Sequence, residues 1–139
     1  MRDRSWYERL QAIGAFADEL EAPDFEAGQW HPSAPTRDDP TVWTMPWFEL
    51  SERATAFVRA LAGIMITFDW PTWAATDRAQ ALYRDRAALA AATPDELTRL
   101  VTAVVREDRF NEGALGESFD SGVMVAIARR AAALASEAA

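Results

Sequence analysis

The sequence predicts an all-α fold, a compact orthogonal bundle of about five helices with a long Pro-rich N-terminal loop. Three observations predict it. Apolar residues recur at helical spacing in several segments. Residues that favour helix starts precede those segments, and strand signals such as an Asn-Gly turn are nearly absent. At 139 residues, half of them apolar, the chain suits a single domain, residues 1–139, with a sizeable core.

Asp3 and Ser5 favour the start of the first helix, with Ser5 placed to cap it, and the helix is expected to end between Leu20 and Pro23. Its apolar positions lie three or four residues apart, at Trp6, Leu10, Ile13, Ala17 and Leu20. Residues 21–44 then hold four prolines and no period, which predicts an irregular, acidic, Pro-rich segment. Its aromatic residues indicate that it lies across the body of the protein.

A second helix is expected after Ser51, a favourable N-cap, and it should be the most buried element. Its stripe comprises Ala54, Phe57, Val58, Leu61, Met65 and Phe68. Pro71 suits the first position of a third helix, which would run to Ala81 or Tyr83. Asp69 falls just before that start and is expected to cap it. The alternative is a carboxyl with a raised pKa among aromatic residues.

Thr93, Pro94 and Glu96 predict a fourth helix that begins with a capping box. Its apolar positions are Leu97, Leu100, Val101, Val104 and Val105. A glycine turn follows, and Asp120 or Ser121 is placed to cap a last helix. The second helix is expected to pack against the fourth and fifth, with Phe110 and Phe119 in the core.

Composition excludes several chemistries. The chain has no cysteine, so it has no disulfide, thiolate nucleophile or Cys-based zinc site, and His31 alone cannot make a histidine-rich metal site. All 14 basic residues are arginine, which excludes a Schiff-base lysine and a Walker-type loop and is typical of a GC-rich bacterial genome. We therefore predict no metal and no cofactor.

Net charge and hydropathy indicate which classes of binding partner are not expected. The net charge is −8, and residues 1–44 hold nine acidic residues against four arginines, so nucleic acid is not an expected partner. The longest apolar run, Ala60 to Phe68, is too short to span a bilayer, and the first ten residues are too charged for a signal peptide. We expect a cytoplasmic protein without a membrane partner.

Two segments carry a resemblance to a known family. Phe68-Asp69-Trp70 follows an apolar helix, and Arg109-Phe110-Asn111-Glu112-Gly113 and Phe119-Asp120-Ser121-Gly122 come some forty residues later. Over residues 45–135 this pattern resembles a family of small bacterial proteins defined only by a domain of unknown function. The resemblance implies no activity, cofactor or partner, and it leaves the N-terminal acidic segment outside the family-like core.

These motifs give the candidate binding residues Asp69, Trp70, Trp73, Arg109 and Glu112. The corner at residues 68–73 is expected to face the turn at residues 109–113. The structural alternative is that Arg109 and Glu112 form an ion pair that fixes this turn.

Three functions stay open. The favoured one is a non-catalytic interaction protein, because Trp and Arg are common in binding hot spots. It would form a homodimer or bind a protein partner or a small-molecule ligand, and its acidic segment would attract a basic partner. The second is a small hydrolase or lyase in which Asp69, Glu112 and either Asp108 or Asp120 act as acid and base or hold a divalent metal. Arg109 would then bind an anionic group. The third is an acidic inhibitor that occupies a basic nucleic-acid site. An exposed apolar patch would favour the first, and two acids converging in one cleft the second.

Overall fold

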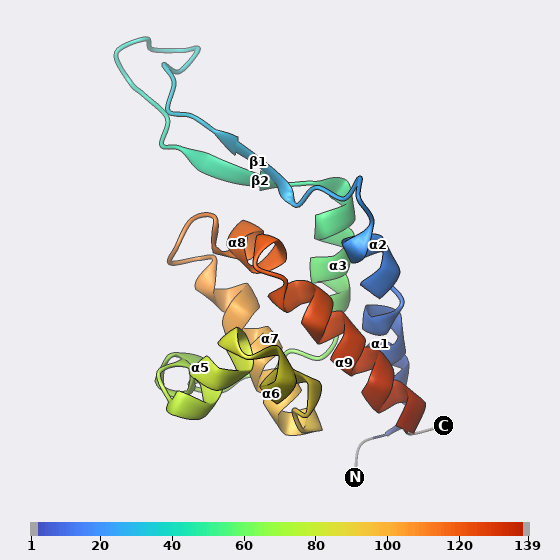
Figure 1. Cartoon of the computed structure of the whole chain (residues 1–139). Coiled ribbons are helices and arrows are strands. Elements are labelled where there is room, and N and C mark those ends of the chain that lie inside the picture. The colour runs from blue at the N-terminus through green and yellow to red at the C-terminus, as the bar shows by residue number, and fades with distance from the viewer. Residues whose placement is uncertain (1–2, 138–139) are drawn as a thin grey trace.

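The computed structural model describes residues 3–137 as a helical body from which a β-hairpin projects (Figure 1). The elements are α1 (Arg4–Gly14), α2 (Ala17–Glu21), β1 (Gly28–His31), β2 (Trp47–Leu50), α3 (Glu52–Ala62), α4 (Trp70–Ala74), α5 (Asp77–Arg84), α6 (Arg86–Ala90), α7 (Pro94–Glu107), α8 (Ala114–Asp120) and α9 (Val123–Glu137). In the described part of the chain no helix is long and apolar enough to cross a bilayer.

The core lies where α1, α3, α7 and α9 meet, and α9 packs along α1 (Figure 1). Its fully buried large side chains include Leu10, Ile13, Phe57, Leu61, Leu97, Val101, Met124 and Ile127. Seven residues of α7 are buried, against three of α3. Helix α7 is therefore more buried than α3. The prediction that the helix after Ser51, which is α3, would be the most buried element was wrong. The expected contact of α3 with α7 is present.

Most of the predicted helix starts are confirmed. The Ser51 side chain accepts from the Ala54 N–H, and Thr93 with Glu96 forms a complete capping box. The Asp69 carboxylate accepts a hydrogen bond from the Thr72 N–H at the start of α4, as the capping interpretation expected. At α1 the cap is Asp3, which accepts from the Trp6 N–H, and not Ser5.

The predicted all-α bundle of about five helices is wrong. The described chain contains a two-stranded antiparallel sheet and more than five helices, and its N-terminal region, residues 4–21, is helical. Two of the expected helices are each divided. The first divides into α1 and α2 near Ala15, and the third divides at Thr76, whose side chain caps α5. Asp85 caps α6, which the sequence pattern did not predict.

The Pro-rich segment forms a β-hairpin, not an irregular loop across the body. Strand β1 pairs with β2 in a register that runs from Gly28 opposite Leu50 to His31 opposite Trp47, and Pro35 bridges Trp43 farther out. We call residues 28–50 the arm. Its prolines lie outside both strands, because proline cannot donate a ladder hydrogen bond, and each strand is four residues long. The loop end of the arm projects away from the helices (Figure 1).

Candidate functional site

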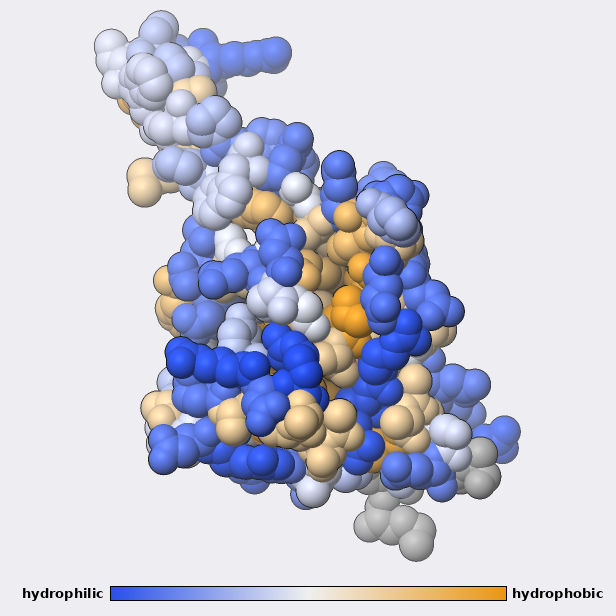
Figure 2. Space-filling view, in the orientation of Figure 1, coloured by the Kyte–Doolittle hydropathy of each residue, from blue (hydrophilic) through white to orange (hydrophobic). Residues whose placement is uncertain are grey.

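The arm carries most of the large apolar side chains that the described structure leaves exposed. Trp43 is 59% exposed and Met45 80% exposed, and Trp30, Val42 and Trp47 are also exposed. Figure 2 shows the arm projecting from the body as a mostly pale surface, as expected on a scale that places tryptophan near neutral. The sheet has only two strands, so each strand has one unpaired edge. On the arm, His31 stacks on Trp47 at 4.3 Å between ring centroids and contacts the Glu49 carboxylate at 3.0 Å.

The base of the arm is fixed against the start of α8. The Phe48 N–H donates to Glu112 Oε1 at 2.7 Å. Gly113, at φ +87°, lies under the Trp30 ring, and a Cβ there would approach that ring to 2.3 Å. A Cβ at Gly116 would approach the Phe48 ring to 2.6 Å. Glycine therefore permits the close approach of the arm to α8 at both positions, and at Gly113 it also permits the left-handed backbone.

A cleft of about 620 Å³ lies between the arm and α8, and we call it the acidic cleft. Three carboxylates line it, those of Glu112, Glu117 and Asp120, and no basic side chain is among its lining residues. The remaining lining residues are Gly28, Gln29, Trp30, Phe48, Gly113, Gly116 and Ser121. Arg86 is fixed at one end, where it donates to the Ser121 carbonyl. The cleft thus combines an aromatic wall with three carboxylates that take part in none of the described ion pairs.

A second cavity, of about 300 Å³, lies between α4 and α5 on one side and α7 and α8 on the other. We call it the Trp70 cavity. Its apolar wall is formed by Trp70, Trp73, Tyr83, Leu100 and Val104. Its polar lining residues are Gln80, Arg84, Glu107, Asn111, Glu117 and Ser118. A mostly apolar concavity with a few polar groups is the usual form of a small-molecule site.

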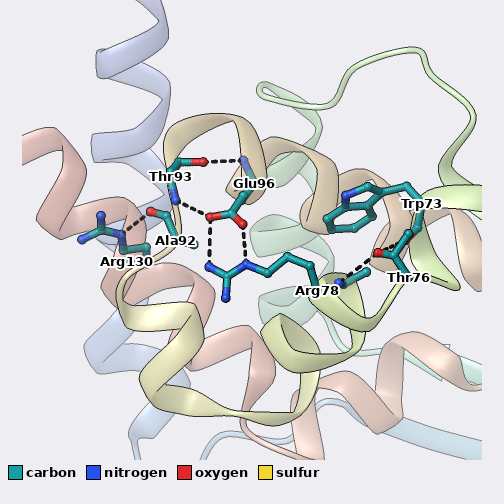
Figure 3. A network of polar contacts seen from close by, with 8 residues as sticks. Trp73, Thr76, Arg78, Ala92, Thr93, Glu96 and Arg130 are labelled. Carbon is teal, nitrogen blue, oxygen red and sulfur yellow. Dashed lines mark hydrogen bonds and ion pairs between the residues drawn. The ribbon is translucent and has the colours of Figure 1, made fainter.

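The Arg78–Glu96 ion pair connects the two walls of this cavity. Arg78, on α5, donates from Nε to Glu96 Oε2 at 2.5 Å and from Nη2 to Oε1 at 3.2 Å (Figure 3). The hydrogen bond from Arg78, and then that from the Thr93 N–H, lowers the pKa of Glu96 from 4.5 to about 2. Glu96 also closes the capping box of α7, so one carboxylate sets the position of α5 on α7.

The structure separates the candidate residues that the sequence suggested. Trp70 and Trp73 line the Trp70 cavity, whereas Glu112 lines the acidic cleft and accepts from β2. Asp69 and Arg109 are exposed and are among the lining residues of neither cavity. The described ion pairs do not include one between Arg109 and Glu112.

The expected approach of the corner to the turn is seen in one contact. The rings of Trp70 and Phe110 lie 6.1 Å apart between centroids. Phe110, however, is 77% exposed and is not a core residue as predicted, whereas Phe119 is buried as predicted. No group of three or more His, Cys, Asp or Glu residues in the described chain could hold a metal ion.

Comparison with models of known protein families assigns the sequence to a family. A model described as a family of unknown function, DUF6508, matches residues 6–137. The chain belongs to this family. The match begins well before residue 45, so the acidic N-terminal segment, expected to lie outside the family-like core, is part of the DUF6508 domain. Neither a curated protein nor a solved structure matches the sequence.

Sequence reasoning missed several residues of the two sites in this DUF6508 domain. Gln80, Tyr83 and Arg84 share one face of α5 at spacings of three and four residues, and that face turns to the Trp70 cavity. The spacing was visible in the sequence, but the polar character of the segment hid it. Glu117 lies in a seven-residue helix that was expected to be a turn. It lines both cavities.

Proposed function

We propose that this protein is a non-catalytic interaction module that binds a basic, extended segment of a partner protein along its arm. The observation that carries the proposal is the group of exposed aromatic side chains on the arm, of which Trp30 lines the acidic cleft. Large apolar side chains gathered on a projecting element mark an interaction surface more often than a structural one.

The aromatic residues supply the apolar part of the proposed contact. Trp30, Trp43 and Trp47 are the residue type most enriched in binding hot spots, and each can cover a large apolar area with few rotatable bonds. An extended segment could also add to an unpaired edge of β1 or β2, where backbone hydrogen bonds supply affinity for any sequence.

Charge selects a basic partner. The arm holds Asp38, Asp39 and Glu49 against one arginine, Arg37, and one histidine, His31, and the acidic cleft adds three carboxylates. Hydrogen bonds from the Thr41 hydroxyl and the Thr41 N–H hold the pKa of Asp39 below its usual value, so the arm tip keeps its charge. A lysine or arginine side chain in the cleft would meet the Trp30 ring and two or three carboxylates.

The same charge argues against a second copy of the chain as the occupant. Each chain carries a net charge of −8, so the approach of two arms would bring like charges together. We therefore favour a heterologous partner over the homodimer.

One observation meets the criterion for the carboxylate-dependent hydrolase or lyase, because Glu112 and Asp120 line the same cleft. The reading is disfavoured because Asp69 lies outside this cleft and is engaged with Thr72, while Glu112 accepts a hydrogen bond from the Phe48 N–H. General acid–base catalysis needs both groups within reach of one substrate.

The test is fluorescence anisotropy with a labelled peptide of alternating lysine and valine, and with its glutamate–valine counterpart. We expect the lysine peptide alone to bind, with an affinity that falls as salt is raised. Trp43→Ser and Asp120→Asn should each weaken its binding about tenfold, or about 1.4 kcal/mol. Ile66→Ser is the matched control, because Ile66 is 40% exposed but lies outside the arm, and its binding should be unchanged.

Three results would overturn the proposal. The first is equal binding of the two peptides, and the second is unchanged binding by both arm variants. The third is a dimer in analytical ultracentrifugation that Trp43→Ser dissociates, since the arm would then be occupied by a second copy.

A further inference from the structure

We infer that the Trp70 cavity is a binding site for a zwitterionic amino acid with an apolar side chain. This site is distinct from the arm, and its argument does not depend on the interaction proposed above. It rests on three features of the cavity: separated opposite charges, aromatic walls and a firmly connected frame.

The charges are the first feature. The carboxylates of Glu107 and Glu117 and the guanidinium of Arg84 line the same cavity. Among the described residues none of the three takes part in an ion pair within 4 Å or in a side-chain hydrogen bond. Opposite charges that share a cavity without meeting suit a ligand that carries both charges. Its ammonium group would pair with the glutamates and its carboxylate with Arg84.

The aromatic walls are the second feature. Trp70 and Trp73 are half-buried, and Trp73 is held by an edge contact with Phe68 at 6.1 Å between centroids. Leu100 and Val104 of α7 are buried behind them. A volume of about 300 Å³ is at the small end of ligand pockets, which suits a molecule of amino-acid size and excludes a dinucleotide or a peptide chain.

Hydrogen bonds hold the uncharged polar side chains of the cavity in place. The Gln80 amide nitrogen donates to the Ala74 carbonyl at 2.9 Å, which leaves the Gln80 side-chain oxygen available to accept. Tyr83 and Ser118 join their hydroxyls at 3.3 Å across the cavity wall. An ammonium group has three donors, and Glu107, Glu117 and Gln80 together offer three acceptors.

The frame is the third feature. The Arg78–Glu96 pair fixes α5 to α7, and the α4 wall is capped by Asp69. A preformed cavity loses less conformational freedom on binding than one that must be assembled. The role that remains for Asp69 is therefore to hold the helix that carries Trp70 and Trp73.

The experiment is isothermal titration calorimetry of the full chain with L-phenylalanine and two analogues that each lack one charge. Phenethylamine lacks the carboxylate, and 3-phenylpropionate lacks the ammonium group. We expect L-phenylalanine to bind at least tenfold more tightly than either analogue. Glu107→Gln and Arg84→Gln should each weaken L-phenylalanine binding at least tenfold, and Arg84→Gln should leave phenethylamine binding unchanged.

The control variants make the same changes of charge at residues that do not line the Trp70 cavity. Glu52→Gln and Arg59→Gln alter exposed residues of α3, and both should bind L-phenylalanine as the native chain does. Asp120→Asn alters the acidic cleft only, so it should also leave this binding unchanged. Absence of binding at millimolar L-phenylalanine would overturn the inference. So would phenethylamine binding as tight as that of L-phenylalanine, which would indicate a site for organic cations.

Discussion

Replacing Glu96 by glutamine should destabilise the protein at neutral pH and remove part of its sensitivity to acid. The glutamine side-chain oxygen can still accept from the Thr93 N–H, so the capping hydrogen bond is retained. What is lost is the negative charge that faces Arg78. The substitution therefore isolates the ion pair that joins α5 to α7.

The magnitude follows from the pKa of Glu96. A fall from 4.5 to about 2 corresponds to about 3 kcal/mol at about 1.4 kcal/mol per unit. The Glu96 side chain is 22% exposed but that of Arg78 is 50% exposed, so solvent screening reduces the expected value to roughly 1–2 kcal/mol. Because the folded-state pKa is lowered, this stability is fully present above pH 4.5 and is lost as the pH falls through 4.5 towards 2.

The assay is urea unfolding of the native chain and Glu96→Gln at pH 7 and at pH 3. The free energies of unfolding should differ by roughly 1–2 kcal/mol at pH 7 and by less than half of that at pH 3. Glu8→Gln is the matched control, because Glu8 pairs with Arg4 at an exposed i,i+4 site and should change stability by only a few tenths of a kcal/mol. A Glu96→Gln difference that is independent of pH, or no larger than that of Glu8→Gln, would refute the reasoning.

Two further predictions concern single packing positions. Gly113→Ala should lower the free energy of unfolding by about 1–3 kcal/mol, since its φ of +87° is strained for alanine and its Cβ would meet the Trp30 ring; urea unfolding measures this, and an unchanged midpoint would contradict it. Thr102→Val should cost about 1 kcal/mol in the same assay, because the Ile66 N–H would lose the Thr102 hydroxyl that accepts from it at 3.0 Å in a part-buried hydrogen bond. Thr67→Val changes an exposed neighbour and should have little effect.

The helix starts could be predicted because their causes are local. Ser51, Asp69 and Thr93 each accept from an N–H three residues ahead, and that spacing is visible in the sequence. The arm could not be predicted in this way. Its strands are four residues long, and what holds them is the pairing of residues about twenty apart together with the contact to Glu112. Neither a period nor a turn signal records such contacts.

The structure places the sequence-based candidate residues in different surroundings. Trp70 and Trp73 were chosen because aromatic residues crowd a helix start, and both line a cavity. Glu112 was chosen with Arg109 because the two are close in sequence, yet its carboxylate turns to β2, 64 residues away in the chain. Proximity along the chain was a poor guide there, because a turn presents neighbouring side chains in different directions.

Helix α8 is the element that connects the arm to the Trp70 cavity. A glycine in a helix interior costs about 1 kcal/mol relative to alanine, and this helix contains one at Gly116. The space that the missing side chain leaves is filled by the Phe48 ring. Burial of that ring and the hydrogen bond to Glu112 offset the cost of the glycine. Gly116 therefore lowers the helix propensity of α8 and permits its contact with the arm. The same helix directs Glu117 towards both cavities, and for this reason the two proposals are best tested at Asp120 and at Glu107, each of which lines only one of them.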